Sequence, residues 1–129
     1  HGYLAGVVES LRVVFDAKPG VDRMLTLGNM GWITGQTYQA SAVLALRIAT
    51  VLLLGSVLRP RPTRLQEVIQ KHGVTILKTG STFLRDILSQ PAAEAEVRAS
   101  GKPQTLRVAT FCAEPLTEAV QSFAQETLC

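Results

Sequence analysis

Cysteine, histidine and aromatic residues are scarce in this sequence. Its two cysteines, Cys112 and Cys129, are too few for a disulfide framework, so we expect reduced thiols and a cytoplasmic protein. The two histidines, His1 and His72, have no cysteine or acid at metal-ligand spacing, which leaves a metal site without support. No nucleophile elbow surrounds any of the serines. The sequence therefore contains no complete catalytic set that can be recognised from the residues alone.

The chain also lacks a concentrated stretch of one charge. Its 13 basic and 10 acidic residues are interleaved and give a net charge of +3, and no stacking aromatics accompany the basic ones. We therefore expect no nucleic-acid partner. The densest basic run, RPRPTR at residues 59–64, fits either a solvated loop or an anion contact through an arginine fork.

Only one apolar stretch, residues 40–58, approaches the length of a membrane span. Arg47 interrupts its middle, and β-branched residues from Thr50 onward make its second half resemble a strand. A buried helix followed by a buried strand explains this stretch better, so no membrane partner is expected.

Helical and strand-like patterns alternate along the 129 residues, a length that suits one domain. The strand-like runs are residues 24–27, 50–55, 74–80 and 106–111. Helical spacing of apolar residues occurs over residues 3–15, 37–49, 62–73, 81–90 and 114–127, and residues 91–104 extend the fourth helix before becoming a loop. This alternation predicts an α/β fold with a largely parallel sheet and right-handed crossovers.

Ligands of such sheets bind at the carboxyl ends of the strands, where three loops are expected. These are GNMGWITG at residues 28–35, TGST at residues 79–82 and CAEP at residues 112–115. The first contains Trp32, the only tryptophan of the chain, within a frame of glycines that let the backbone approach a ligand. The indole either forms a pocket wall or plugs the end of the sheet.

The other two loops also allow two interpretations each. The hydroxyls of Ser81 and Thr82, at the start of a predicted helix, either meet an anion or cap that helix. Glu114 lies at a helix-entry position, where an acid interacts favourably with the helix dipole, and could equally accept a hydrogen bond from a bound hydroxyl or amine.

Several segments, in a fixed order, resemble the acetyl-CoA synthetase branch of the AMP-forming, acyl-adenylate-forming enzymes. The most specific are GWITG at residues 31–35 and AEP at residues 113–115, which are similar to that family's Gly-Trp-Val-Thr-Gly and Gly-Glu-Pro segments. VTIL followed by TGSTFLR, residues 74–85, is similar to its Val-Thr and Ala-Pro-Thr-Ala-x-Arg stretch. The resemblance covers essentially the whole chain. Residues 107–115 are particularly similar to the synthetase portion of propionyl-CoA synthases.

The resemblance implies binding residues at the matching positions. Those implied for the acyl group are Ile33, Thr34, the supporting Trp32, and Cys112. Those implied for the adenosine are Ala113, Glu114 and Pro115, and Gly80 is implied to flank the path by which CoA enters. Ala113 stands where the family has glycine, and Cys112 stands where acetate-using members have valine. The second departure argues against acetate specificity, and the similarity to propionyl-CoA synthases implies another short acid, such as propionate or 3-hydroxypropionate.

The resemblance also implies a ligase reaction. A carboxylic acid reacts with ATP, accompanied by Mg²⁺, to give acyl-AMP, and CoA then takes the acyl group. The family's phosphate loop would lie before residue 1, and its later motifs and lysine-bearing domain would lie after residue 129. We therefore expect a segment of the large amino-terminal domain that is inactive alone and packs against the remainder of the enzyme or self-associates. The alternative is a stand-alone, non-catalytic α/β module that binds a nucleotide or a protein.

Overall fold

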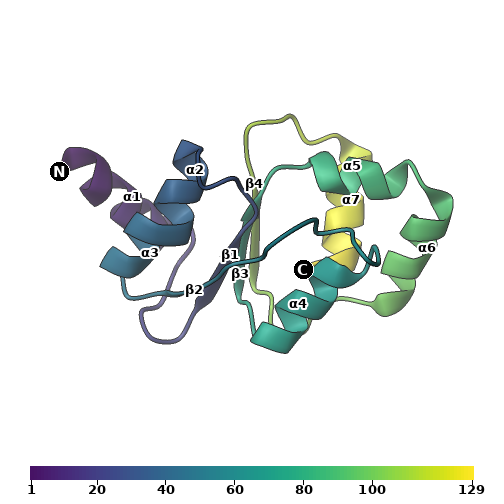
Figure 1. Ribbon diagram of the computed structural model, residues 1–129, viewed down its shortest axis with the longest axis horizontal. Helices are drawn as coiled ribbons and strands as arrows, with labels where there is room; N and C mark the ends of the chain where they lie inside the picture. The colour runs from purple at the N-terminus through teal and green to yellow at the C-terminus, as the bar shows by residue number, and fades with distance from the viewer.

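The computed structural model describes all residues 1–129 as one parallel sheet between two layers of helices (Figure 1). The four strands are β1 (Arg23–Thr26), β2 (Ala49–Val51), β3 (Ile76–Thr79) and β4 (Val108–Phe111). Their order in the sheet is β2-β1-β3-β4, and every neighbouring pair is parallel. The structure thus confirms the predicted α/β class and parallel sheet.

Helices cover both faces of the sheet (Figure 1). One layer contains α1 (Gly2–Val13), α2 (Ile33–Gly35), the π-helix η1 (Gln36–Ser41) and α3 (Ala42–Ala45). The other contains α4 (Arg64–His72), α5 (Thr82–Leu88), α6 (Pro91–Ser100) and α7 (Glu118–Thr127). No helix combines the length and the hydropathy that a bilayer span requires.

Each face of the sheet has its own hydrophobic core, because successive side chains of a strand point to opposite faces. Met24 and Ile76 belong to a cluster of 8 buried residues beneath α1 and α3. Their neighbours Leu25 and Leu77 belong to a cluster of 14 buried residues beneath α4 to α7. Burial on both faces explains why these strands read as continuous apolar runs.

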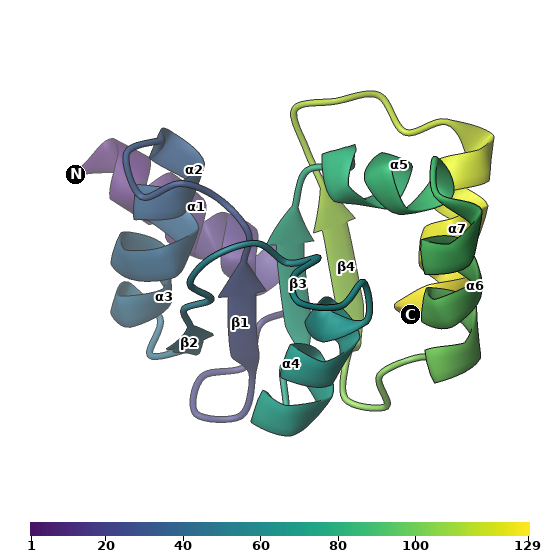
Figure 2. The same ribbon diagram turned by 45° about the vertical axis from the view of Figure 1, so that its right-hand side comes forward.

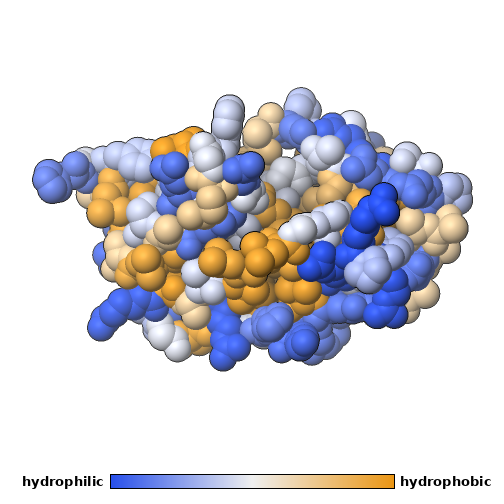
Figure 3. Space-filling model, viewed as in Figure 1, coloured by the Kyte–Doolittle hydropathy of each residue, from blue (hydrophilic) through white to orange (hydrophobic).

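The predicted buried strand at residues 50–55 was wrong beyond Val51. Val51 pairs with Leu25, and β1 ends one residue later, so the following residues have almost no strand to pair with. Leu52 and Leu54 are consequently 61% and 84% exposed. Figure 3 shows a band of hydrophobic residues across the face where β2 and the segment after it run.

Helix boundaries also differ from the prediction. The helix expected from residue 37 already begins at Ile33 and passes through the π-helical turns of η1. Residues 91–100 form the separate helix α6 instead of extending α5. Pro91 explains this break, because proline has no N–H to donate and its ring obstructs the preceding turn, whereas it fits the first turn of a new helix.

Candidate functional site

The three predicted loops meet at one edge of the sheet, because the strands before them are parallel and adjacent. Figure 2 shows the loops after β1, β3 and β4 leaving from the same end of the sheet. Backbone hydrogen bonds hold the first residues of the loops after β1 and β4 to the end of β3: Leu27 N donates to Lys78 O at 2.9 Å, and Cys112 N donates to Thr79 O at 3.0 Å. The prediction that these loops lie together is confirmed.

The loop after β1 folds back closely onto the helix that follows it. A β-carbon at Gly35 would lie 2.2 Å from the carbonyl oxygen of Asn29, so only glycine permits this approach. Gln39 of η1 secures the start of the loop, since its Nε2 donates to Thr26 O at 3.0 Å and to Gly28 O at 2.6 Å. Gln39 was not predicted as a functional residue, although a glutamine within an apolar helical pattern was a usable signal.

Trp32 does not plug the end of the sheet, since its side chain is 70% exposed. Ile33 is 57% exposed, and Thr34 is half-buried. The structure therefore places these three residues at the carboxyl edge with two large apolar side chains open to solvent.

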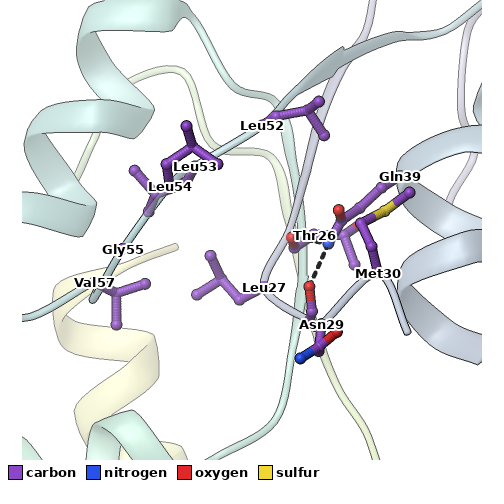
Figure 4. Close-up of a pocket in the computed structure, with 11 residues that line it drawn as sticks. Thr26, Leu27, Asn29, Met30, Gln39, Leu52, Leu53, Leu54, Gly55 and Val57 are labelled. Carbon is purple, nitrogen blue, oxygen red and sulfur yellow. Dashed lines mark hydrogen bonds between the residues drawn. The ribbon is translucent and has the colours of Figure 1, made fainter. Parts of the chain in front are cut away.

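The largest cavity at this edge lies beside these residues, not beneath them. Its volume is about 600 Å³, and it lies between the end of β1, the loop after β1, and residues 52–57. Figure 4 shows Gln39 and Met30 on one side of the space and Leu53 and Val57 on the other. Its lining is mainly aliphatic, and Trp32 does not contribute to it.

A smaller hollow of about 210 Å³ adjoins this cavity, and Leu27 and Val57 line both. Thr79, Gly80 and Thr82 form the rest of its polar and backbone wall. Gly80 also lies against the loop after β4, since a β-carbon there would be 3.8 Å from the carbonyl oxygen of Cys112.

The hydroxyls of Ser81 and Thr82 meet an internal anion, the carboxylate of Glu114. Ser81 Oγ donates to Glu114 Oε2 at 2.8 Å, and Thr82 Oγ1 donates to Oε1 at 2.7 Å. Arg85 adds an ion pair with the same carboxylate. The prediction that one of these hydroxyls caps α5 was wrong, because the N-cap residue Ser81 makes no side-chain capping bond.

Glu114 likewise does not occupy the helix-entry position expected from the sequence. Helix α7 begins only at Glu118, and Thr117 caps it by accepting a hydrogen bond from Val120 N. Hydrogen bonds from Thr82 and Ser81, followed by the charge of Arg85, lower the pKa of Glu114 below its ordinary value. Glu114 is therefore a carboxylate at neutral pH.

The residues around Glu114 complete this side of the edge. Cys112 is half-buried with a free thiol, and Pro115 is exposed. Ala113 adopts a φ of +70°, in the left-handed region that favours glycine. The structure thus brings Gly80, Cys112, Ala113 and Glu114 together on one side of the edge.

The basic run at residues 59–64 is a loop that its own arginines organise. Arg64 donates to the carbonyl oxygens of Leu54, Ser56 and Arg59, and Arg61 pairs with Glu67 at 3.0 Å. These bonds favour the loop interpretation over the anion contact. Elsewhere, no three His, Cys, Asp or Glu side chains are grouped so that they could hold a metal ion.

Comparison with known proteins identifies the family. A family model described as "AMP-binding enzyme" matches residues 1–129. The chain belongs to this AMP-binding enzyme family. It is 36% identical over 115 residues to an acetyl-coenzyme A synthetase of Thiobacillus denitrificans, covering 89% of this chain and 17% of that protein. It is 35% identical over 116 residues to acetyl-coenzyme A synthetase 2 of Saccharomyces cerevisiae, covering 90% of this chain and 16% of the relative.

A third relative of this AMP-binding enzyme is similar to nearly the whole chain. An acetyl-coenzyme A synthetase of Vibrio parahaemolyticus is 32% identical over 127 residues, which is 98% of this chain and 19% of the relative. The chain thus spans less than a fifth of the length of these relatives. The resemblance inferred from GWITG and AEP is confirmed at the level of the family and of its acetyl-CoA synthetase branch.

Proposed function

We propose that the chain is part of an AMP-forming acyl-CoA synthetase, which joins a short-chain carboxylic acid to CoA at the expense of ATP. The observation that carries this proposal is the similarity of nearly the whole chain to proteins named acetyl-coenzyme A synthetase. The loops at the carboxyl edge support it, because ligands of parallel sheets bind there.

The proposed reaction has two steps. A carboxylate oxygen of the acid attacks the α-phosphorus of ATP, and pyrophosphate leaves to give acyl-AMP. The sulfur of CoA then attacks the acyl carbonyl carbon, AMP leaves, and the thiol proton passes to solvent. Binding residues accelerate both steps by holding the reacting atoms close and aligned.

The proposed roles divide the carboxyl edge between its two sides. On the side of α2, Ile33 and Thr34 line the acyl group and Trp32 supports them. The apolar side chains of Trp32 and Ile33 are open to solvent in this chain, so they are available for this contact. On the side of β4, Cys112 faces the acyl group. The remaining proposed contacts are Ala113, Glu114 and Pro115 with the adenosine and Gly80 with the path of CoA.

We propose that the acid is not restricted to acetate. The Cys112 side chain is half-buried at the edge and lacks the second branch of the valine found in acetate-using members. A pocket wall with less branching leaves room for one further carbon, as in propionate or 3-hydroxypropionate. A difference of one methylene in such a pocket changes selectivity by about 10–200-fold.

The 129 residues contain no group of three acidic, histidine or cysteine side chains close enough to hold a metal ion by themselves. A Mg²⁺ ion that accompanies ATP would be held mainly by the phosphate oxygens and water, because Mg²⁺ in nucleotide sites takes only one or two protein carboxylates.

The test is an assay of the full-length protein that carries this chain in its reading frame. We expect pyrophosphate release that requires ATP and a short acid, acyl-CoA formation when CoA is added, and a higher kcat/KM for propionate or 3-hydroxypropionate than for acetate. Absence of acid-dependent pyrophosphate release would refute the proposal, and a preference for acetate would refute only its substrate.

Two further measurements separate this proposal from a stand-alone binding module. We expect the purified 129-residue chain to release no pyrophosphate, because no phosphate-binding loop is recognisable in it. We also expect the gene to continue in frame on both sides of the segment that encodes His1 to Cys129. A start codon near His1 and a stop codon after Cys129 would favour the module instead.

A further inference from the structure

We propose that Glu114 is a positioning residue, which fastens the loop after β4 onto the start of α5 and leaves contact with the nucleotide to the backbone of that loop. This inference rests on the proposed function, since it assigns a role within the same site. It replaces the direct nucleotide contact implied for the Glu114 side chain with an indirect one.

Both oxygens of the Glu114 carboxylate already accept hydrogen bonds from side chains of the α5 segment. Oε1 accepts from Thr82 Oγ1 at 2.7 Å, and Oε2 accepts from Ser81 Oγ at 2.8 Å and pairs with Arg85. All three partners lie in the first residues of the α5 segment. A ligand that bonded to this carboxylate would compete with these three partners, and displacing any of them would leave a charged or polar group without its partner.

The path of the loop after β4 also supports a positioning role for Glu114. Cys112 N donates to Thr79 O at 3.0 Å, so the loop begins in register with β3. The next residue, Ala113, takes a φ of +70°, an unfavourable conformation that turns the chain and carries Glu114 over α5. Charge-assisted hydrogen bonds to Glu114 offset this local cost. We call this set of bonds among Glu114, Ser81, Thr82 and Arg85 the Glu114 clasp.

The clasp determines where two walls of the proposed site stand. Gly80 precedes Ser81, and a β-carbon added to it would lie 3.8 Å from the carbonyl oxygen of Cys112. Opening the clasp would let residues 112–117 move away from Gly80, and with them the proposed contacts to the acyl group and the adenosine. Loss of the clasp should therefore weaken binding of both substrates while leaving the chemical step much less affected.

A double-mutant cycle in the full-length enzyme tests this role. We expect Glu114→Gln and Arg85→Met each to raise the KM for ATP and for the acid by about 10-fold, with kcat changed by less than about 3-fold. The double variant should resemble either single variant, because both break the same Glu114–Arg85 ion pair of the clasp. Glu114→Asp should recover part of the loss. Glu96→Gln, the matched control, removes an equal charge from an exposed position of α6 and should change nothing.

Direct contact of the Glu114 side chain with ATP predicts a different pattern. Arg85→Met would then leave the KM for ATP near its normal value, or the double variant would combine two independent losses of about 10-fold into about 100-fold. Either result would overturn the proposal.

Amide hydrogen exchange provides a readout that does not need activity. In the same full-length protein, we expect exchange at Cys112 and through residues 112–117 to accelerate about 10-fold in Glu114→Gln and in Arg85→Met, but not in Glu96→Gln. If exchange accelerates while the wild-type protein makes no acyl-AMP, the clasp stands and the proposed function fails. If the wild type is active and exchange is unchanged in both variants, the clasp fails and the proposed function stands.

Discussion

Ala113 has a strained backbone conformation and stands at a position where the family has glycine. Its φ of +70° costs an L-residue about 1–2 kcal/mol, whereas glycine adopts it freely and loses about 0.5–1 kcal/mol through its greater freedom in the unfolded chain. We therefore expect Ala113→Gly to increase the free energy of unfolding by about 0.5–1 kcal/mol, measured by urea denaturation. Ala95→Gly, in the exposed middle of α6, should lower it by about 1 kcal/mol. Equal losses in both variants would contradict the assignment of strain to Ala113.

Asp22 is a buried carboxylate far from the candidate site, at the amino-terminal edge of the sheet. It is 3% exposed and accepts hydrogen bonds from Lys18 N at 2.8 Å and from Arg107 at 2.7 Å. Burial by itself would raise the pKa of Asp22, but bonds from Lys18, Thr75 and Arg107, together with the charge of Arg107, outweigh burial and lower the pKa. The carboxylate thus ties the loop before β1 to the residue that precedes β4.

The lowered pKa fixes the pH range in which this carboxylate stabilises the fold. Its contribution is complete above the unfolded pKa of about 3.9 and is lost as the pH falls through the lower folded pKa. We expect Asp22→Asn to reduce the free energy of unfolding by about 1.5–3 kcal/mol at pH 7, and the difference from wild type to shrink below about pH 4. Urea denaturation from pH 7 to pH 3 measures both effects. Asp86→Asn, which removes an equal charge from an exposed position of α5, is the control and should change little at any pH.

At the scale of an element, Gly35 decides whether the loop after β1 can close on its helix. A β-carbon there would overlap the backbone of Asn29, with its nearest atom at 2.2 Å, and backbone cannot move aside as a flexible side chain can. We expect Gly35→Ala to destabilise the chain by about 1–3 kcal/mol in thermal or urea denaturation. Gly6→Ala in α1, where a β-carbon meets open space, should instead stabilise it by about 0.5–1 kcal/mol. A stabilising Gly35→Ala would show that the loop does not need this close approach.

Local pattern was sufficient for most elements and insufficient at the sheet edge. Helix α4 was predicted at residues 62–73 and is found at Arg64–His72, because its apolar spacing and its terminal Gly73 are both local signals. Leu52 and Leu54 looked buried for the same local reason. Their exposure depends on where the neighbouring strand β1 ends, and that is information about pairing which no single run of residues contains.

Some features of the candidate site were likewise predictable from the sequence, and others were not. The parallel direction of the strands was predictable, and it places the three loops at one edge of the sheet. The partner of Glu114 was not predictable, because Ser81 and Thr82 lie more than 30 residues earlier and offered a sufficient local role as caps. A usable signal was the spacing of Thr82 and Arg85, which places a hydroxyl and a guanidinium on one face of a helix.

At the scale of the whole molecule, the exposed leucines after β2 should make the isolated chain self-associate. Leu52 and Leu54 lie beside an edge strand, and unpaired edges with apolar side chains favour association. We expect the double variant Leu52→Lys/Leu54→Lys to shift the isolated chain toward monomer in sedimentation equilibrium without loss of stability. Gln125→Lys/Gln121→Lys adds the same charge on exposed positions of α7 and serves as the control. Equal dissociation by both variants would mean that net charge, and not this edge, governs association.

The hydrophobic clusters on the two faces of the sheet differ in size, so we expect the two sides of the carboxyl edge to differ in rigidity. The 14-residue cluster underlies α5 and the loop after β4, while only 8 residues underlie the helices next to the loop at residues 28–35. Adaptation to a bulkier acid should therefore begin on the less rigid side, which has the smaller cluster. In a laboratory selection for activity on longer acids, we expect substitutions to accumulate among residues 28–34 before any are tolerated in residues 114–117.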